Sequence, residues 1–152
     1  MRISTKGRYA LRVMVELSVH NPEVYVALDE IAEHQEISKK YLEAIMKNLV
    51  KAKLVIGLRG KGGGYKLSRS PETYTVGSIL KATEGSLAPV ACLEEGAEHC
   101  PRAEHCVTLP MWRELYQLVD DYFESITLDK LTHQAALLRA DGQDDMWESC
   151  II

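Results

Sequence analysis

Four glycines lie among the five residues 60–64, and this run restricts the fold more than any other part of the chain. Glycine loses more conformational freedom on folding than any other residue, so a run of glycines is disfavoured inside helices and strands. Two short segments that favour β-structure flank the run, at 54–59 and 65–68. The sequence therefore predicts a β-hairpin with a basic tip at Arg59 and Lys61.

Helical periodicity dominates the residues before this hairpin. Residues 4–20 space their apolar side chains as one helix face, and this segment begins with the basic residues Lys6, Arg8 and Arg12. Asn21 and Pro22 end it, and a short helix follows at 28–35. Ser38 is a good N-cap for a third helix. The expected buried stripe of that helix is Tyr41, Leu42, Ile45, Met46, Leu49 and Val50.

A short helix, a tight turn and a second helix with a basic exposed face are typical of a helix-turn-helix, which the hairpin extends to a winged form. Charge agrees with this prediction. Residues 1–70 carry 13 Lys and Arg against 7 Asp and Glu, whereas residues 71–152 carry 5 against 15, although the whole chain has a net charge of only −4. The excess of positive charge in the first half indicates a polyanionic partner.

Double-stranded DNA is the polyanion that this arrangement suits. The major groove accepts a helix, and Lys40, Glu43 and Lys47 on the exposed face can reach base edges. The minor groove attracts basic side chains such as Arg59 or Lys61. The alternative is a small helical domain with a solvated charged face, which the charge asymmetry disfavours. The glycine spacing matches neither a P-loop nor a dinucleotide-binding motif.

Three cysteines lie close together in a polar segment without periodicity, at about 86–108. Cys92, Cys100 and Cys106 are separated by seven and five residues, and Cys150 lies apart from them. Three thiolates on a loop suit an iron-sulfur cluster, zinc or copper, and a thiol-disulfide switch is a further alternative. His99 or His105 could complete a zinc site. Buried structural cysteines are disfavoured, because the segment is rich in Glu and His.

Helical spacing returns on both sides of this segment. Thr75 caps a helix that Glu84 and Gly85 end. After the cysteines, apolar residues alternate in steps of three and four, which is typical of a long helix that pairs with another. The expected dimerisation residues are Leu109, Trp112, Tyr116, Val119, Phe123 and Ile126.

The predicted organisation has four parts. They are a DNA-binding domain at 1–85, a cysteine loop at 86–108, a dimerisation helix region at 109–139 and an acidic mobile tail at 140–152. The fold class expected is mainly α. An uninterrupted apolar run of about 18 residues, long enough to cross a membrane, is absent, so we expect a cytoplasmic protein without a membrane partner.

Several ordered motifs resemble the IscR-like (Rrf-type) transcriptional regulators. They are the opening MRISTKGRYAL, the segments ISKKYLE at 37–43 and LVIGLRGKGGGY at 54–65, TVG at 75–77, Glu84 with Gly85, the three cysteines and Trp112. The resemblance covers about residues 1–130. It implies a homodimeric winged helix-turn-helix regulator that holds an iron-sulfur cluster, 2Fe-2S or 4Fe-4S, on Cys92, Cys100 and Cys106. It also implies that the recognition helix contacts DNA through Lys40, Tyr41, Glu43 and Ala44.

One departure from the family concerns the fourth cluster ligand. The family's name-giving members have a histidine three residues after the last cluster cysteine, where this chain has Leu109. Other relatives use an acidic residue of the first helix, which aligns here with Arg8. The remaining local candidates for the ligand are Glu98, His99, Glu104 and His105.

We therefore expect a DNA-binding regulator, commonly a repressor, that is controlled by a cluster and binds a roughly palindromic operator. The expected DNA contacts are Lys6, Arg8, Ser38, Lys40, Tyr41, Glu43, Ala44, Lys47, Arg59 and Lys61. A cluster-free regulator that responds to a partner protein, zinc or thiol oxidation is the alternative. An enzyme with a small-molecule substrate is disfavoured because the cysteines have no catalytic residues near them in the sequence, and an electron carrier is the third class.

Overall fold

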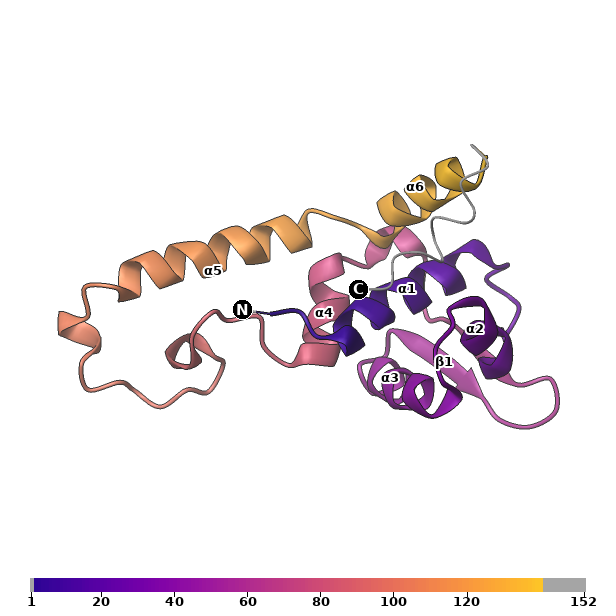
Figure 1. Cartoon of the computed structure of the whole chain (residues 1–152), viewed down its shortest axis with the longest axis horizontal. Coiled ribbons are helices and arrows are strands. Elements are labelled where there is room, and N and C mark those ends of the chain that lie inside the picture. The colour runs from indigo at the N-terminus through magenta and orange to yellow at the C-terminus, as the bar shows by residue number, and fades with distance from the viewer. Residues whose placement is uncertain (1, 141–152) are drawn as a thin grey trace.

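Helices form most of the structure, a computed structural model that describes residues 2–140 (Figure 1). The expected tail at 140–152, with Cys150, lies outside the described residues except for residue 140. The longer elements are α1 (Thr5–Val19), α2 (Leu28–His34), α3 (Lys39–Lys51), β1 (Val55–Leu58), β2 (Gly64–Leu67), α4 (Val76–Glu84), α5 (Leu109–Glu124) and α6 (Leu128–Ala140). Short 3-10 turns lie at Pro71–Thr73, Ala91–Leu93 and Ala103–His105. The mainly α winged-helix prediction is confirmed.

Three helices begin at side-chain N-caps, of which the sequence predicts those at Ser38 and Thr75. Ser4 accepts a hydrogen bond from the backbone N–H of Gly7, and Ser38 accepts one from that of Tyr41. Thr75 and Ser78 form a reciprocal capping box at the start of α4. Gly85 ends α4 with φ of +83°, a backbone conformation that glycine adopts without steric cost.

The wing is an antiparallel pair in which Val55 faces Leu67 and Leu58 faces Gly64. Close to its turn, the strand β2 is tied to the loop before α2. Val26 and Tyr65 exchange two backbone hydrogen bonds, of 2.9 and 2.8 Å. Gly64 lies so close to this loop that a Cβ would overlap the backbone of Val26. The close approach therefore requires glycine at position 64.

The core surrounds α1, which packs against α3, α4 and α6. Fully buried side chains include Val13, Met14, Ile45, Tyr74 and Leu128. The predicted buried stripe of α3 is only partly correct, because Tyr41 and Val50 are 38% and 40% exposed at its edges. Leu42, Ile45, Met46 and Leu49 form the buried face.

The region 109–139 contains two helices and not one. Figure 1 shows α5 and the cysteine loop extending away from the helices around α1, whereas α6 returns to α1. Leu128 and Ala135 of α6 belong to the main core. The placement of Ile126 on the long helix was wrong: α5 ends at Glu124, and Ile126 accepts a 2.8 Å backbone hydrogen bond from Val76.

Candidate DNA interface and cysteine loop

The exposed face of α3 carries the residues that the sequence analysis proposed to contact DNA. Lys40, Glu43, Ala44 and Lys47 are all exposed, because the opposite face of the amphipathic helix is buried in the core. Ser38 is exposed at the N-terminus of α3. This face combines positive charge, one carboxylate and a methyl group, which are the groups that contact base edges and phosphates.

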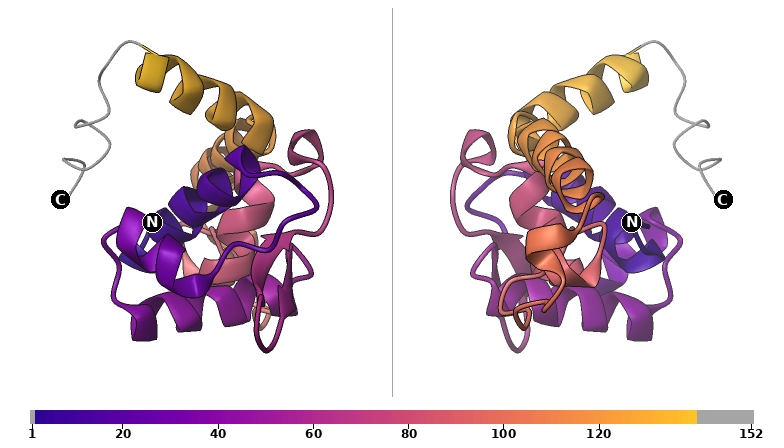
Figure 2. Two further views of the ribbon diagram at one scale, coloured as in Figure 1. Left: turned by 90° about the vertical axis from the view of Figure 1, so that its right-hand side faces the viewer. Right: turned by 90° about the vertical axis from the view of Figure 1, so that its left-hand side faces the viewer.

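The wing tip lies on the same side of the molecule as α3 (Figures 1 and 2). Arg59 and Lys61 are exposed there, and Gly60 and Gly62 adopt positive φ angles of 96° and 76°. The structure thus presents the α3 face and the wing tip together. At the start of α1, Lys6 is half-buried and Arg8 is exposed, with the Arg8 guanidinium donating to Thr5 Oγ1.

Tyr41 is held in place by an aromatic contact with α1. Its ring packs edge-on against Tyr9, with the ring centroids 5.9 Å apart. The Arg12 guanidinium lies 5.4 Å from the centroid of the Tyr9 ring. Arg12 also donates to the side chain and the backbone carbonyl of Gln35, each at 2.9 Å. The first turn of α3 is therefore positioned by α1 and by the turn that follows α2.

Glu16 is a buried carboxylate that the sequence analysis did not identify as important. Its Oε1 lies 2.9 Å from His34 Nδ1 and 3.3 Å from His20 Nε2, and its Oε2 accepts from Gln35 at 3.1 Å. Burial favours the neutral acid, but the two histidines outweigh it and lower the pKa of Glu16. The hydrogen bond to Glu16 raises the pKa of His34. Glu16 thus links α1 to the helix-turn-helix.

The cysteine loop is irregular except for its two 3-10 turns. Cys92 is exposed, Cys100 and Cys106 are partly exposed, and all three are free thiols. Among residues 2–140, no group of three or more His, Cys, Asp or Glu side chains is gathered to hold a metal. The loop therefore presents thiol ligands suited to an iron-sulfur cluster, zinc or copper, but the structure does not bring the three thiols together.

Cys106 lies just before α5. The side-chain hydroxyl of Thr108 and the backbone N–H groups of Thr108 and Leu109 lower the pKa of its thiol. The proposed fourth ligands Glu98, His99, Glu104 and His105 are exposed around the thiols. Leu109, the first residue of α5, is buried at 8% exposure.

The helix α5 carries two adjacent apolar stripes. Three of the expected dimerisation residues, Tyr116, Phe123 and Ile126, pack against the chain's own Val76, Leu80 and Leu87. Trp112 and Val119 are partly buried. The exposed stripe consists of Met111, Leu115, Leu118 and Tyr122. Both stripes repeat in steps of three and four, so the spacing alone does not show which one faces the chain's own core.

Comparison with known proteins decides the family. The family model described as "Rrf2: Iron-dependent Transcriptional regulator" matches residues 3–134. The chain belongs to the Rrf2 family. Its relatives include the HTH-type transcriptional regulator IscR of Pectobacterium carotovorum subsp. carotovorum, which is 39% identical over 95% of this chain and 87% of the relative. IscR of Vibrio campbellii is 33% identical over 96% of this chain and 86% of the relative.

Solved structures agree with this assignment. CymR, the global cysteine regulator of B. subtilis, has a TM-score of 0.70 at 34% identity, over 88% of this chain and 98% of that one. IscR of T. potens has a TM-score of 0.69 at 33% identity, over 89% and 88% of the two chains. This Rrf2 protein is therefore a DNA-binding transcriptional regulator, and the expectation that it is not an enzyme is confirmed. No helix within residues 2–140 is long and apolar enough to cross a membrane.

Proposed function

We propose that this Rrf2 protein is a homodimeric cytoplasmic repressor that binds a roughly palindromic operator, and that an iron-sulfur cluster on Cys92, Cys100 and Cys106 controls its DNA affinity. The observation that carries the proposal is the connection between two parts. One is the α3 face with the wing tip on the same side, and the other is the loop of three free thiols, which connects α4 of this domain to α5.

DNA contact is assigned to the ten residues named from the sequence. The α3 side chains enter the major groove, with Glu43 at base edges and Lys40 and Lys47 at base edges or phosphates. Arg59 and Lys61 lie at the wing tip, where a basic side chain reaches the backbone or a narrow minor groove. Ala44 offers a methyl contact only. The salt dependence of operator affinity tests this assignment, because removing a side chain that neutralises a phosphate makes the dependence less steep.

Dimerisation is assigned to α5 and principally to its exposed stripe. Leu118 and Tyr122 are each 63% exposed, and Met111 and Leu115 extend the same face. A second copy of the chain would remove this apolar surface from water, while the other stripe packs against α4 within each subunit. Two α3 helices about 34–36 Å apart then contact successive turns of the duplex, which is why the operator should be palindromic.

The cluster assignment is supported by the chemistry of the donors. Thiolates are the ligands that iron-sulfur clusters require, and the hydrogen bonds around Cys106 lower the pKa of its thiol and so favour the thiolate form. The thiolates of Cys92, Cys100 and Cys106 would hold the cluster, which would cross-link these three positions of the loop. The loop must close to bring its cysteines together, and because α5 begins at Leu109, closure acts directly on the first turn of that helix.

Control of DNA binding follows from linkage. If loop closure favours one orientation of α5, then the cluster and the operator affect each other's binding by the same factor. Such coupling between two sites is typically about 5- to 150-fold in affinity. Operator affinities of the cluster-loaded and the cluster-free protein show which of the two forms represses.

Anaerobic purification with and without the cysteines tests the proposal. The wild-type chain is compared with a variant in which Cys92, Cys100 and Cys106 are all changed to alanine, by absorption, iron and sulfide content, and operator affinity. We expect a brown wild-type protein, a colourless dimeric variant and a change in affinity between them. Cys100→Ala alone should also abolish the chromophore. A full iron-sulfur spectrum in that variant contradicts the ligand assignment.

A cluster-free regulator is the second candidate, because the three thiols lie apart in an exposed loop. Its signal would be zinc, thiol oxidation or a partner protein, and a relative, CymR of Staphylococcus aureus, has been solved in an oxidized form. Protein that stays colourless after reconstitution with iron and sulfide supports this candidate. Zinc content and mass analysis after mild oxidation then separate its three signals.

A further inference from the structure

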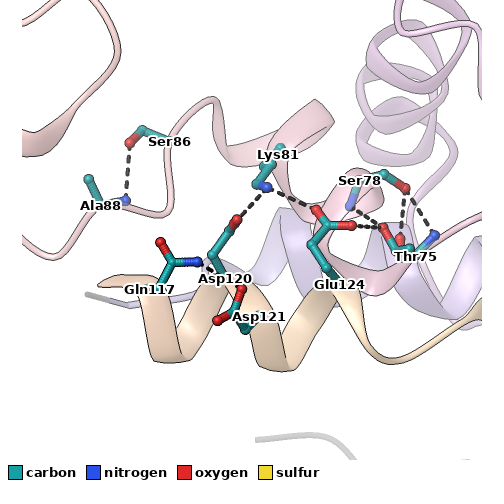
Figure 3. Close-up of polar contacts among 9 residues, drawn as sticks. All are labelled: Thr75, Ser78, Lys81, Ser86, Ala88, Gln117, Asp120, Asp121 and Glu124. Atoms are coloured by element: carbon teal, nitrogen blue, oxygen red, sulfur yellow. Dashed lines mark hydrogen bonds and ion pairs between the residues drawn. The ribbon is translucent and has the colours of Figure 1, made fainter. Parts of the chain in front are cut away.

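A polar joint connects α4 of the DNA-binding domain to the last turns of α5 (Figure 3). The Lys81 ammonium lies 2.5 Å from Asp120 Oδ1 and 2.8 Å from Glu124 Oε1, so it joins two carboxylates that stand one turn apart on α5. The Thr75 hydroxyl donates to the other oxygen of Glu124 at 2.6 Å. One lysine and one N-cap residue of α4 thus hold two positions of α5.

The backbone reinforces this joint. Val76 donates to the carbonyl of Ile126, Leu128 donates to that of Tyr74, and Thr75 pairs with Thr127. Gly77 leaves room for Glu124, because a Cβ there would lie 2.5 Å from Glu124 Oε1. The end of α5 is therefore attached to the start of α4 by side-chain and main-chain contacts together.

An apolar cluster accompanies the joint. Its buried residues are Val76 and Leu80 of α4 and Leu87 just after it, and Tyr116 and Phe123 of α5 are among the side chains that pack against them. Apolar contact is non-directional, so it opposes rotation or sliding of α5 less than hydrogen-bonded ion pairs do. Hydrogen-bonded ion pairs have a preferred geometry. Hydrogen bonds to Asp120 and Glu124 outweigh the burial of Lys81 and raise its pKa, so the ammonium stays charged.

We propose that the joint of Thr75, Gly77, Lys81, Asp120 and Glu124 fixes the direction in which α5 leaves the DNA-binding domain, and thereby sets the separation of operator half-sites that the dimer accepts. The proposal rests on the proposed function, because it needs a dimer through α5 and DNA contact through α3. The α5 helix projects beyond the domain that carries α3 (Figure 1), so a small rotation at the joint moves the two α3 helices of a dimer relative to each other. Lys81 acts as a positioning residue, since it lies on α4 and not on the α3 face or the wing.

Selection from random duplexes and a spacing series test the proposal. Operators selected by the wild-type chain are rebuilt with half-sites moved apart or together by one or two base pairs, and affinities are measured at constant salt. The variants are Lys81→Met, which removes both ion pairs, and Gly77→Ala, which crowds Glu124 without changing a charge. Arg113→Met is the control, because it makes the same charge change at an exposed position of α5.

We expect the wild type and the control to lose about tenfold in affinity when the spacing is wrong. Lys81→Met and Gly77→Ala should lose less than about threefold over the same series, because a joint free to rotate accepts several spacings. A Lys81→Met dimer with undiminished spacing preference overturns the proposal. A wild-type protein that selects no operator, or that is monomeric, overturns the proposed function instead.

Amide hydrogen exchange tests the joint without DNA. Exchange in the last turn of α5 and the first turn of α4 should rise about tenfold in Lys81→Met relative to Arg113→Met, because local opening is easier there. Amides of the buried face of α3 should be unchanged and serve as an internal control for folding. Equal exchange rates in Lys81→Met and Arg113→Met would contradict the proposed role of the joint, even if no operator is found.

Discussion

Glu16 shows how one buried charge can organise a DNA-binding module. It is 4% exposed, yet its pKa is lowered, because the hydrogen bonds of His34 and His20 outweigh the cost of burial. Through Gln35 it also orients Arg12, which lies over the ring of Tyr9. The sequence marks Glu16 only as a charge that interrupts an apolar helix face, and its partners His34 and Gln35 come from the end of α2.

This network makes stability depend on pH. The pKa of His34 is raised from its ordinary value of 6.5, so its contribution is present below that value and is lost as pH rises through the folded-state pKa. The lowered pKa of Glu16 contributes above about 4.5 and is lost as pH falls through its folded-state value. The network is therefore most stabilising between these limits.

We predict that the free energy of unfolding falls by at most about 1 kcal/mol between pH 6 and pH 8, because solvent screens the half-exposed His34 side chain. Urea unfolding at several pH values measures this fall, and an NMR titration of His34 should follow the same midpoint. His34→Gln should flatten the pH dependence, whereas His133→Gln, at an exposed position on α6, should leave it unchanged. An unchanged slope in His34→Gln argues against the network as its cause.

Arg59 is the residue that best tests whether the wing contacts DNA. Arg59→Ala should weaken operator binding in the cluster-loaded and the cluster-free protein alike, and reduce the salt slope by about 1, because the variant neutralises one phosphate fewer. Affinity measured at several salt concentrations gives both numbers. Arg113→Ala, at an exposed arginine on α5, is the matched control. A steeper or unchanged slope in Arg59→Ala would place Arg59 away from the DNA.

At the scale of elements, Tyr74 connects the wing to the rest of the DNA-binding domain. Its side chain is fully buried, and its hydroxyl donates to the carbonyl of Leu54 at 2.9 Å and accepts from the backbone N–H of Arg69 at 2.9 Å. Those two residues lie just before β1 and just after β2. One phenol thus bonds to the backbone at both ends of the hairpin, and the Leu54 carbonyl also accepts from the Ser68 N–H.

Tyr74→Phe should therefore destabilise the protein by about 1 kcal/mol, because it removes two hydrogen bonds of the hairpin ends while the Leu54 carbonyl keeps its bond from the Ser68 N–H. Thermal or urea unfolding measures the loss. Tyr25→Phe is the control, because Tyr25 is half-buried and its ring, which lies under Lys66, remains in the variant. If Tyr74→Phe is as stable as Tyr25→Phe, another group satisfies the hairpin ends.

The assembly of the whole molecule depends on α5. One apolar stripe of this helix packs within its own subunit, and the other is exposed to solvent. Leu118→Glu should give a folded monomer, because a charge in the exposed stripe cannot be buried against a second copy without a large cost. Sedimentation at micromolar concentration measures the state, and circular dichroism shows that the fold persists. Arg113→Glu, on α5 outside this stripe, should remain dimeric. A dimeric Leu118→Glu protein would place the interface elsewhere.

Local chemistry was predictable from the sequence. The caps at Ser4, Ser38 and Thr75, the end of α4 at Gly85 and the turn at 60–64 depend on groups a few residues apart, so their residue types reveal them directly. The exposed face of α3 follows from helical periodicity for the same reason. The family motifs combine these local signals in a specific order.

Only the tertiary structure decided which groups meet across the chain. Ser4 binds Glu84, 80 residues away, and Lys81 binds Asp120 and Glu124 on a helix beyond the cysteine loop. The two stripes of α5 have the same period, so packing against α4 determined which one is internal. The burial of Glu16 is likewise decided by packing. Helix spacing defines faces within one element, whereas burial depends on how distant elements pack.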